Sequence, residues 1–175
     1  CFDEIVKVDQ KIADQNSTKK LDAGVIKSKN WTRSISQSKI DDSETVTLET
    51  DSKNSVPGRF KREATPTLMI RCLEGKTSFY TSFDGMFVSD TSNYGQLTIR
   101  VDKEKPFVQK TTVSSSNKAL GLWNGSTSIP FIKKLFDKET LLVQATPFNE
   151  SPITLSFDIS GLQNEIEPLR KACKW

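Results

Sequence analysis

The chain has 175 residues, a length that fits one domain burying roughly two-thirds of its unfolded surface without help from a metal or a dense disulfide network. Its 25 basic and 22 acidic residues leave a net charge of +3, which is too small to indicate nucleic acid as a partner. The sequence has no histidine, which excludes Ser-His-Asp and Cys-His nucleophiles, His-bearing zinc sites and the usual general base near neutral pH.

The first fourteen residues, "CFDEIVKVDQKIAD", predict a short amphipathic helix over 1–14. Phe2, Ile5 and Val6 recur on one helical face, and the acidic first turn suits the helix dipole. A polar linker follows, and the alternation in "VIKSKNWTRSISQSKIDD" is loose. We interpret the basic stretch "KSKNWTR" as a solvated face, and we place the β-rich body at residues 40–160.

Period-two alternation predicts strands through this body. In "ETVTLETDS", Val46 and Leu48 point to one side; "TPTLMIRCLEGKTSFYTSF" reads as two strands joined around Glu74-Gly75. In "QLTIRVDKEKP" the apolar residues point inward, so Arg100 and Asp102 lie on the opposite face. "ITLSFDIS" is a further strand.

Two helices are predicted in the second half of the chain. "SIPFIKKLF" reads as a helix with Pro130 in its first turn, preceded by an Asn-Gly turn. Apolar residues at helical spacing predict a final helix over 162–174, kinked or delayed by Pro168. The fold class is therefore mainly β (α+β). We expect a single domain over 1–175, a β-sandwich or curved antiparallel sheet with short N-terminal and C-terminal helices.

Three cysteines, Cys1, Cys72 and Cys173, form neither a C-x-x-C motif nor a metal-ligand set. In an exported protein they would form one disulfide and leave one free thiol. We predict that Cys72 pairs with Cys173, because Cys72 shares the inward face of Leu68 and Ile70 while Cys173 lies on the apolar face of the final helix. Cys1 competes for either partner, and three reduced cysteines in a cytosolic protein are the alternative.

The two ends of the chain carry further expectations. We expect Trp175 to pack beside the disulfide rather than to serve as an exposed anchor for a partner. The chain starts at Cys1 without an initiator Met, so we expect an upstream part to have been removed. A lipid-modified Cys1 is an alternative, although a helix directly after it is unusual for a lipoprotein. No apolar run approaches the ~20 residues of a membrane-spanning helix, so none is predicted.

Metal and cofactor sites are not predicted. Asp41, Asp42 and Glu44 in "IDDSETV" lack the alternating ligand pattern of a calcium loop, so we interpret them as a polar turn. No Gly-rich phosphate loop is present in the sequence. The carboxylates that remain for catalysis are Asp84, Asp102 and Asp158, whose candidate reaction is hydrolysis of cell-wall glycan.

A series of short motifs resembles a known family: "LMIRC", "GKTSFY", "LTIRVD", "SSSNKAL", "FIKKL", "LLVQATPF", "LSFDISGL" and "LRKACKW". In order and spacing they look like the VasI/TagO family, which is associated with type VI secretion systems of Gram-negative bacteria. The opening "CFDEIVK" is similar to the end of that family's "RLACYD" signature, where a further cysteine lies upstream. The resemblance covers most of residues 60–175 and the first seven; Ile99 departs from it, standing where an aromatic residue is usual.

The resemblance implies a periplasmic or otherwise exported accessory protein that binds a protein partner and has no defined enzymatic role. Its recurrent residues here are Arg71, Cys72, Arg100, Asp102 and Cys173. Arg71, Arg100, Asp102 and Trp175 are thus candidate interaction residues. A structural role is the competing interpretation for each, with Arg100 and Asp102 forming an exposed ion pair worth about 0–1 kcal/mol. The alternative functions are an inhibitor or immunity-type protein that sequesters an enzyme, and the glycan hydrolase.

Overall fold

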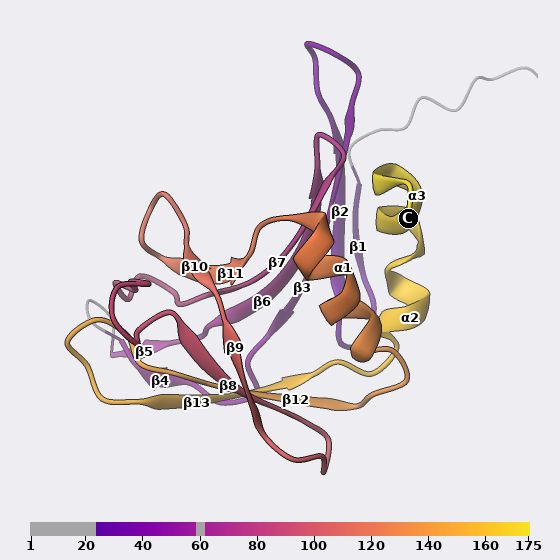
Figure 1. Ribbon diagram of the computed structural model, residues 1–175. Helices are drawn as coiled ribbons and strands as arrows, with labels where there is room; N and C mark the ends of the chain where they lie inside the picture. Colours follow the sequence, from indigo (N-terminus) through magenta and orange to yellow (C-terminus); the bar gives the residue numbers. More distant parts are fainter. Residues whose placement is uncertain (1–23, 59–61) are drawn as a thin grey trace, which may run out of the picture.

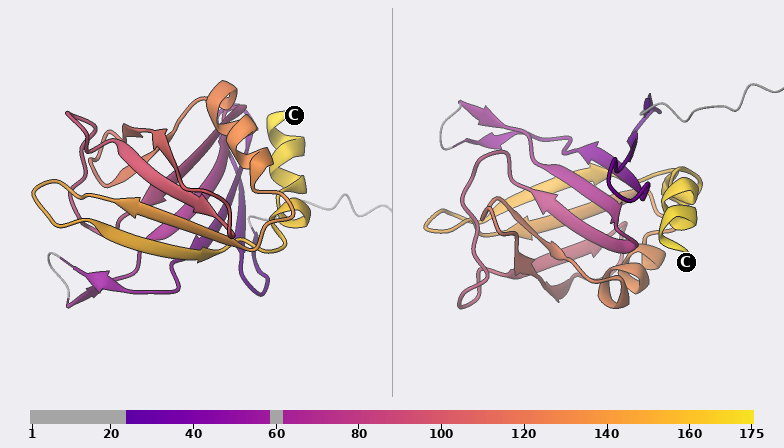
Figure 2. Two further views of the ribbon diagram at one scale, coloured as in Figure 1. Left: turned by 60° about the horizontal axis from the view of Figure 1, so that its bottom comes forward. Right: turned by 90° about the horizontal axis from the view of Figure 1, so that it is seen from above.

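The computed structural model describes residues 24–58 and 62–175. Two antiparallel sheets pack face to face, and the helices gather at one end of this sandwich (Figures 1 and 2). The larger sheet has seven described strands in the order β1-β2-β3-β6-β7-β11-β10. Their bounds are β1 (Gly24–Lys27), β2 (Thr32–Gln37), β3 (Glu44–Asp51), β6 (Thr67–Leu73), β7 (Lys76–Ser82), β11 (Ala119–Leu122) and β10 (Thr112–Val113).

The smaller sheet has the order β13-β12-β8-β9 within the described ranges. Its strands are β8 (Gln96–Val101), β9 (Phe107–Lys110), β12 (Thr140–Ala145) and β13 (Ile153–Asp158). A ribbon of two short strands projects from one end of the sandwich and consists of β4 (Val56–Pro57) and β5 (Glu63–Ala64). The helices are α1 (Gly125–Lys134), α2 (Leu162–Glu165) and α3 (Glu167–Cys173).

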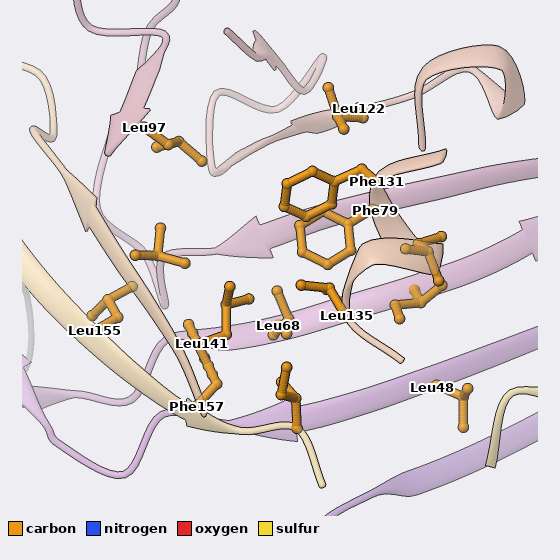
Figure 3. Close-up of a cluster of buried hydrophobic side chains, with 14 of the residues drawn as sticks. Leu48, Leu68, Phe79, Leu97, Leu122, Phe131, Leu135, Leu141, Leu155 and Phe157 are labelled. Carbon is orange, nitrogen blue, oxygen red and sulfur yellow. The ribbon is translucent and has the colours of Figure 1, made fainter. Parts of the chain in front are cut away.

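The core lies between the two sheets and continues under the helices. Figure 3 shows Leu68 and Phe79 of the larger sheet facing Leu141 of the smaller one, with Phe131 of α1 beside them. The Phe79 and Phe131 rings lie 4.7 Å apart between centroids. Full burial of such a side chain stabilises the fold by about 1.5–3 kcal/mol, so this layer is the main source of stability.

The predicted alternation is confirmed on both sheets. Val46 and Leu48 on β3 are fully buried, and so is the inward face of β6. Leu97, Ile99 and Val101 are buried on β8. The hairpin between β6 and β7 turns at Glu74-Gly75, as predicted. Both of these residues have positive φ angles, 49° and 71°, the backbone twist that suits a two-residue hairpin loop.

The first strands of the sandwich begin earlier than residue 40. β1 and β2 form an antiparallel hairpin inside the loosely alternating segment. The solvated interpretation of "KSKNWTR" is wrong for Trp31, which is 1% exposed and whose Nε1 donates a hydrogen bond to the carbonyl oxygen of Ser160. Trp31 precedes β2 and bridges to the chain just after β13, so its burial depends on a contact 129 residues away.

The helices also differ from expectation in their bounds. The Asn-Gly pair before α1 is not a hairpin turn: Asn124 caps the helix by accepting from the Ser126 amide, so α1 starts at Gly125 and Pro130 lies inside it. The predicted break in the final helix is confirmed, because α2 ends at Glu165 and α3 begins at Glu167 with Pro168 in its first turn. The predicted helix over 1–14 and Cys1 lie outside the described residues, and the domain bounds stay a prediction.

Candidate functional site

A disulfide joins Cys72, on the inner face of β6, to Cys173, the last residue of α3, with their Cα atoms 5.8 Å apart. This is the predicted pairing. It holds α3 across the strands β3 and β6, at the end of the sandwich where the helices gather.

Trp175 packs next to this bridge, as predicted. Its Nε1 donates a 2.8 Å hydrogen bond to the hydroxyl of Thr77, and Thr77 is paired directly with Cys72 across the β6–β7 hairpin. The cationic groups of Arg170 and Lys133 lie 5.3 and 5.7 Å from the centre of the indole ring. The ring is partly buried and partnered on several sides, so these contacts give Trp175 a structural role.

Arg100 and Asp102 do not form the expected ion pair. The Arg100 Nε donates to the Glu104 carbonyl oxygen, whereas the Asp102 carboxylate accepts from the Glu139 and Thr140 amides at 3.0 and 2.8 Å. Asp102 follows the end of β8 with a φ angle of 47°, and this left-handed turn leads the side chain toward β12 instead of along the strand face. That either residue also contacts a partner stays a prediction.

Arg71, by contrast, lies on the outer face of the seven-stranded sheet within an aromatic cluster. Its guanidinium carbon is 5.5 Å from the centre of the Tyr80 ring, a cation–π arrangement. Tyr80 stacks on Trp123 with ring centroids 4.8 Å apart and an interplanar angle of 30°. The Trp123 Nε1 donates to the Thr112 carbonyl oxygen at 2.9 Å, which fixes the indole at the end of β11.

Gly121 makes this stacking possible. It is paired with Tyr80 across β7 and β11, and a Cβ atom at Gly121 would lie 2.3 Å from the Tyr80 Cβ and 2.6 Å from the Phe79 carbonyl oxygen. Any side chain at this position would push Tyr80 off the sheet. The missing side chain therefore lets the Tyr80 and Trp123 rings meet above the strand.

A hollow of about 600 Å³ opens beside this cluster, and we call it the Arg71 hollow. Its lining residues are Met69, Arg71, Tyr80, Ser82, Val113, Ser114, Ser115, Ser116, Lys118, Ala119 and Trp123. Among the described residues, two cations and no carboxylate line it. Hydroxyl groups from the turn between β10 and β11 form one wall, and the aromatic pair with Met69 provides apolar surface.

The charged and titratable groups of the hollow are Arg71, Lys118 and Tyr80. The Arg71 Nε is shielded from solvent and has no hydrogen-bond partner among the described residues. Burial raises the pKa of the Tyr80 phenol, and the nearby Glu49 adds to this while Arg71 opposes it, so the phenol is neutral at physiological pH. None of the ion pairs within the described ranges joins Glu49 to Arg71.

The carboxylates considered for glycan hydrolysis have structural partners. Asp84 accepts from the Thr65 amide, and Asp102 binds the start of β12. Asp158 accepts from the Ser160 hydroxyl and from Asn30, and Lys53 lies 3.0 Å away. The Ser160 hydrogen bond and Lys53 lower the pKa of Asp158 against the effect of burial. A general acid for glycan cleavage needs the opposite shift.

The acidic stretch at residues 41–44 lies at a hairpin turn. Asp41 accepts hydrogen bonds from the Ser43 amide and hydroxyl between β2 and β3, and Asp42 adopts a φ angle of 57°. The side chains thus serve the turn itself, as the polar-turn interpretation expected.

The whole chain, residues 1–175, matches the family described as type VI secretion system VasI, EvfG. The chain belongs to the VasI family. It is therefore a type VI secretion-associated protein, and the resemblance seen in the sequence motifs is confirmed. No match to a curated protein was found. Within the described residues no helix is long and apolar enough to cross a membrane.

The VasI-family chain is also similar in fold to a solved structure, the invasion associated protein b from Bartonella henselae. The two share 13% sequence identity with a TM-score of 0.55, over 87% of this chain and 100% of that one. At this identity the likeness concerns the fold alone.

Sequence reasoning found one residue of the hollow, Arg71, and missed Tyr80, Trp123 and Gly121. A signal for Tyr80 existed: a two-residue turn at Glu74-Gly75 pairs Met69 with Tyr80, which puts Tyr80 diagonally beside Arg71. Trp123 had no such signal, because the pairing of β11 with β7 joins distant parts of the chain.

Proposed function

We propose that this VasI-family chain is an exported accessory protein of a type VI secretion system. In this proposal it acts by binding another protein of the cell envelope, and the Arg71 hollow is the contact surface. The composition of the hollow carries the proposal. Trp, Tyr and Arg are the residue types most enriched at interface hot spots, and Met is also enriched at interfaces. Here Arg71, Tyr80, Trp123 and Met69 lie together on one sheet face.

The rigidity of the cluster supports a binding role. Tyr80 is 7% exposed and fixed by stacking, and Trp123 is held by its hydrogen bond to Thr112. A surface whose side chains are already ordered loses little conformational entropy when a partner docks. Arg71 and Tyr80 are thus pre-organised on the strands β6 and β7, while the serines and Lys118 of the hollow lie on the turn before β11.

Export is supported by the disulfide between Cys72 and Cys173. Such bonds form and persist in oxidising compartments such as the periplasm and are rare in the cytosol. A binding role without catalysis is supported by the state of the acids. Asp84 and Asp102 are bound to backbone amides, and the lowered pKa of Asp158 keeps it ionised.

Site-specific photo-crosslinking in the native host tests the proposal. A photoreactive benzoylphenylalanine replaces Ser115 on the rim of the hollow, or Lys103 in the exposed turn after β8 as the control. We expect the Ser115 position to crosslink a protein encoded by the type VI secretion cluster, and the Lys103 position to give no such product. Crosslinks from Lys103 alone, or none from Ser115, would contradict the proposal.

Incubation of the purified chain with purified peptidoglycan tests the absence of catalysis. We expect no soluble glycan fragments above the level given by an Asp158→Asn variant. Release that depends on Asp158 would identify a hydrolase instead.

A further inference from the structure

We propose that the Arg71 hollow binds an acidic segment of its protein partner. The segment places a carboxylate against Arg71 and Lys118 and an apolar or planar side chain against Trp123. This inference rests on the proposed function and adds to it the chemistry of the segment that is bound.

The charges of the lining are complementary to an acidic ligand. Arg71 and Lys118 are the charged residues of the lining, and both are cations. Two other arginines of the described ranges form ion pairs: Arg33 with Glu165 and Arg170 with Glu167. Arg71 has no such acid among the described residues, and its Nε, like those of Arg33 and Arg170, is shielded from solvent and has no acceptor there. A carboxylate from outside would supply both.

The guanidinium of Arg71 has a fixed orientation that suits a carboxylate. Arg71 is held over the Tyr80 ring at 5.5 Å, so the planar group is oriented before any ligand arrives. A fixed guanidinium binds a carboxylate through two parallel hydrogen bonds, which an ammonium cannot reproduce. The site therefore favours a carboxylate in a defined orientation over a diffuse negative charge.

The lining of the hollow combines polar and apolar side chains. Ser115 and Ser116 are exposed at the rim and offer hydroxyl donors. Met69 and the Trp123 ring add apolar surface to the lining. A nucleic acid backbone would need a longer track of cations than the two present here. An acidic peptide segment with one apolar or aromatic residue matches all three features.

The test uses a phage-displayed library of random dodecapeptides, panned on the full chain at low salt. We expect the retained peptides to be enriched in Asp and Glu, next to apolar or aromatic residues. For the leading synthetic peptide, Arg71→Gln should weaken the dissociation constant about tenfold to a hundredfold, the range for a charged hydrogen bond. Lys118→Gln should weaken it less, and Arg71→Lys should restore only part of the loss.

Lys103→Gln is the matched control, because it removes the same charge from the exposed turn after β8 of the other sheet and should leave the constant unchanged within about twofold, as expected for screened charges far apart. Lys118→Gln keeps the test informative if Arg71→Gln fails to fold, because Lys118 is exposed. Peptides without acidic enrichment, binding that is equal in Arg71→Gln, or no retained peptide would each overturn the inference. If the Ser115 crosslink persists in those cases, the proposed function stands and only the acidic segment is wrong.

Discussion

The two faces of the seven-stranded sheet differ in burial although they belong to the same strands. On the inner face, Ile70 and Cys72 of β6 are fully buried beneath the smaller sheet and α3. On the outer face, their neighbours Met69 and Arg71 are only partly buried and line a hollow. One strand thus alternates between residues that stabilise the fold and residues available to a partner. Because successive side chains of a strand point to opposite faces, the residues that stabilise the core alternate along β6 with the residues that we propose for binding.

The largest expected effect is a difference in the free energy of unfolding between substitutions at two adjacent residues of β6, Ile70 and Met69. Ile70→Ala removes a fully buried side chain and should cost about 2–5 kcal/mol of unfolding free energy, as large-to-small core changes do. Met69→Ala on the outer face should cost under about 1 kcal/mol, in the range of substitutions away from the core. Urea denaturation of both variants measures the difference. Equal losses would mean that the outer face is also part of the core.

The second prediction concerns the disulfide between Cys72, on the inner face of the seven-stranded sheet, and Cys173 of α3. Cys173→Ser opens a loop between cysteines 101 residues apart and should cost about 2–4 kcal/mol under oxidising conditions. The melting temperature should fall by several degrees. With reductant present the variant and the parent should melt together, which is the internal control. A difference that survives reduction would show that the disulfide is not its source.

A smaller effect should appear with pH at the seam between the sheets. Asp158, at the end of β13, accepts a hydrogen bond from Asn30, which lies before β2. Its pKa is lowered in the folded state, so its contribution is present above the ordinary Asp value of about 4 and is lost as pH falls through the lower folded pKa. Asp158→Asn should therefore destabilise the chain at pH 7, with the gap closing toward pH 3. A gap that stays constant between these pH values would contradict the assignment.

Many of the buried residues between the two sheets could be predicted from the sequence, because local alternation determines which side chains of a strand point inward. Alternation gave the inward residues of β3, β6 and β8, and the helical spacing before Cys173 gave the disulfide face. The buried residue that was not predicted depends on a contact between segments far apart in the sequence. Trp31 is buried only because Ser160 lies beside it, and no local pattern reports that contact.

The outer face around Arg71 was harder to predict, because it too depends on contacts between distant parts of the chain. Arg71 was identified through the family motif, but its surroundings depend on Trp123, which the fold brings there by pairing β11 with β7. The expected Arg100–Asp102 ion pair failed because a strand-face argument was extended past the end of β8, where the backbone turns.

The central claim is that recognition belongs to the outer face around Arg71. Type VI secretion, measured in the native host with each variant as the sole copy, tests it most directly. Arg71→Glu should abolish the contribution of the chain to secretion while its melting temperature stays within a degree or two of the parent. Lys103→Glu, the same charge reversal in the exposed turn after β8 of the other sheet, should support full secretion. Loss of secretion with Lys103→Glu and full activity with Arg71→Glu would contradict the account and move the binding surface to the smaller sheet.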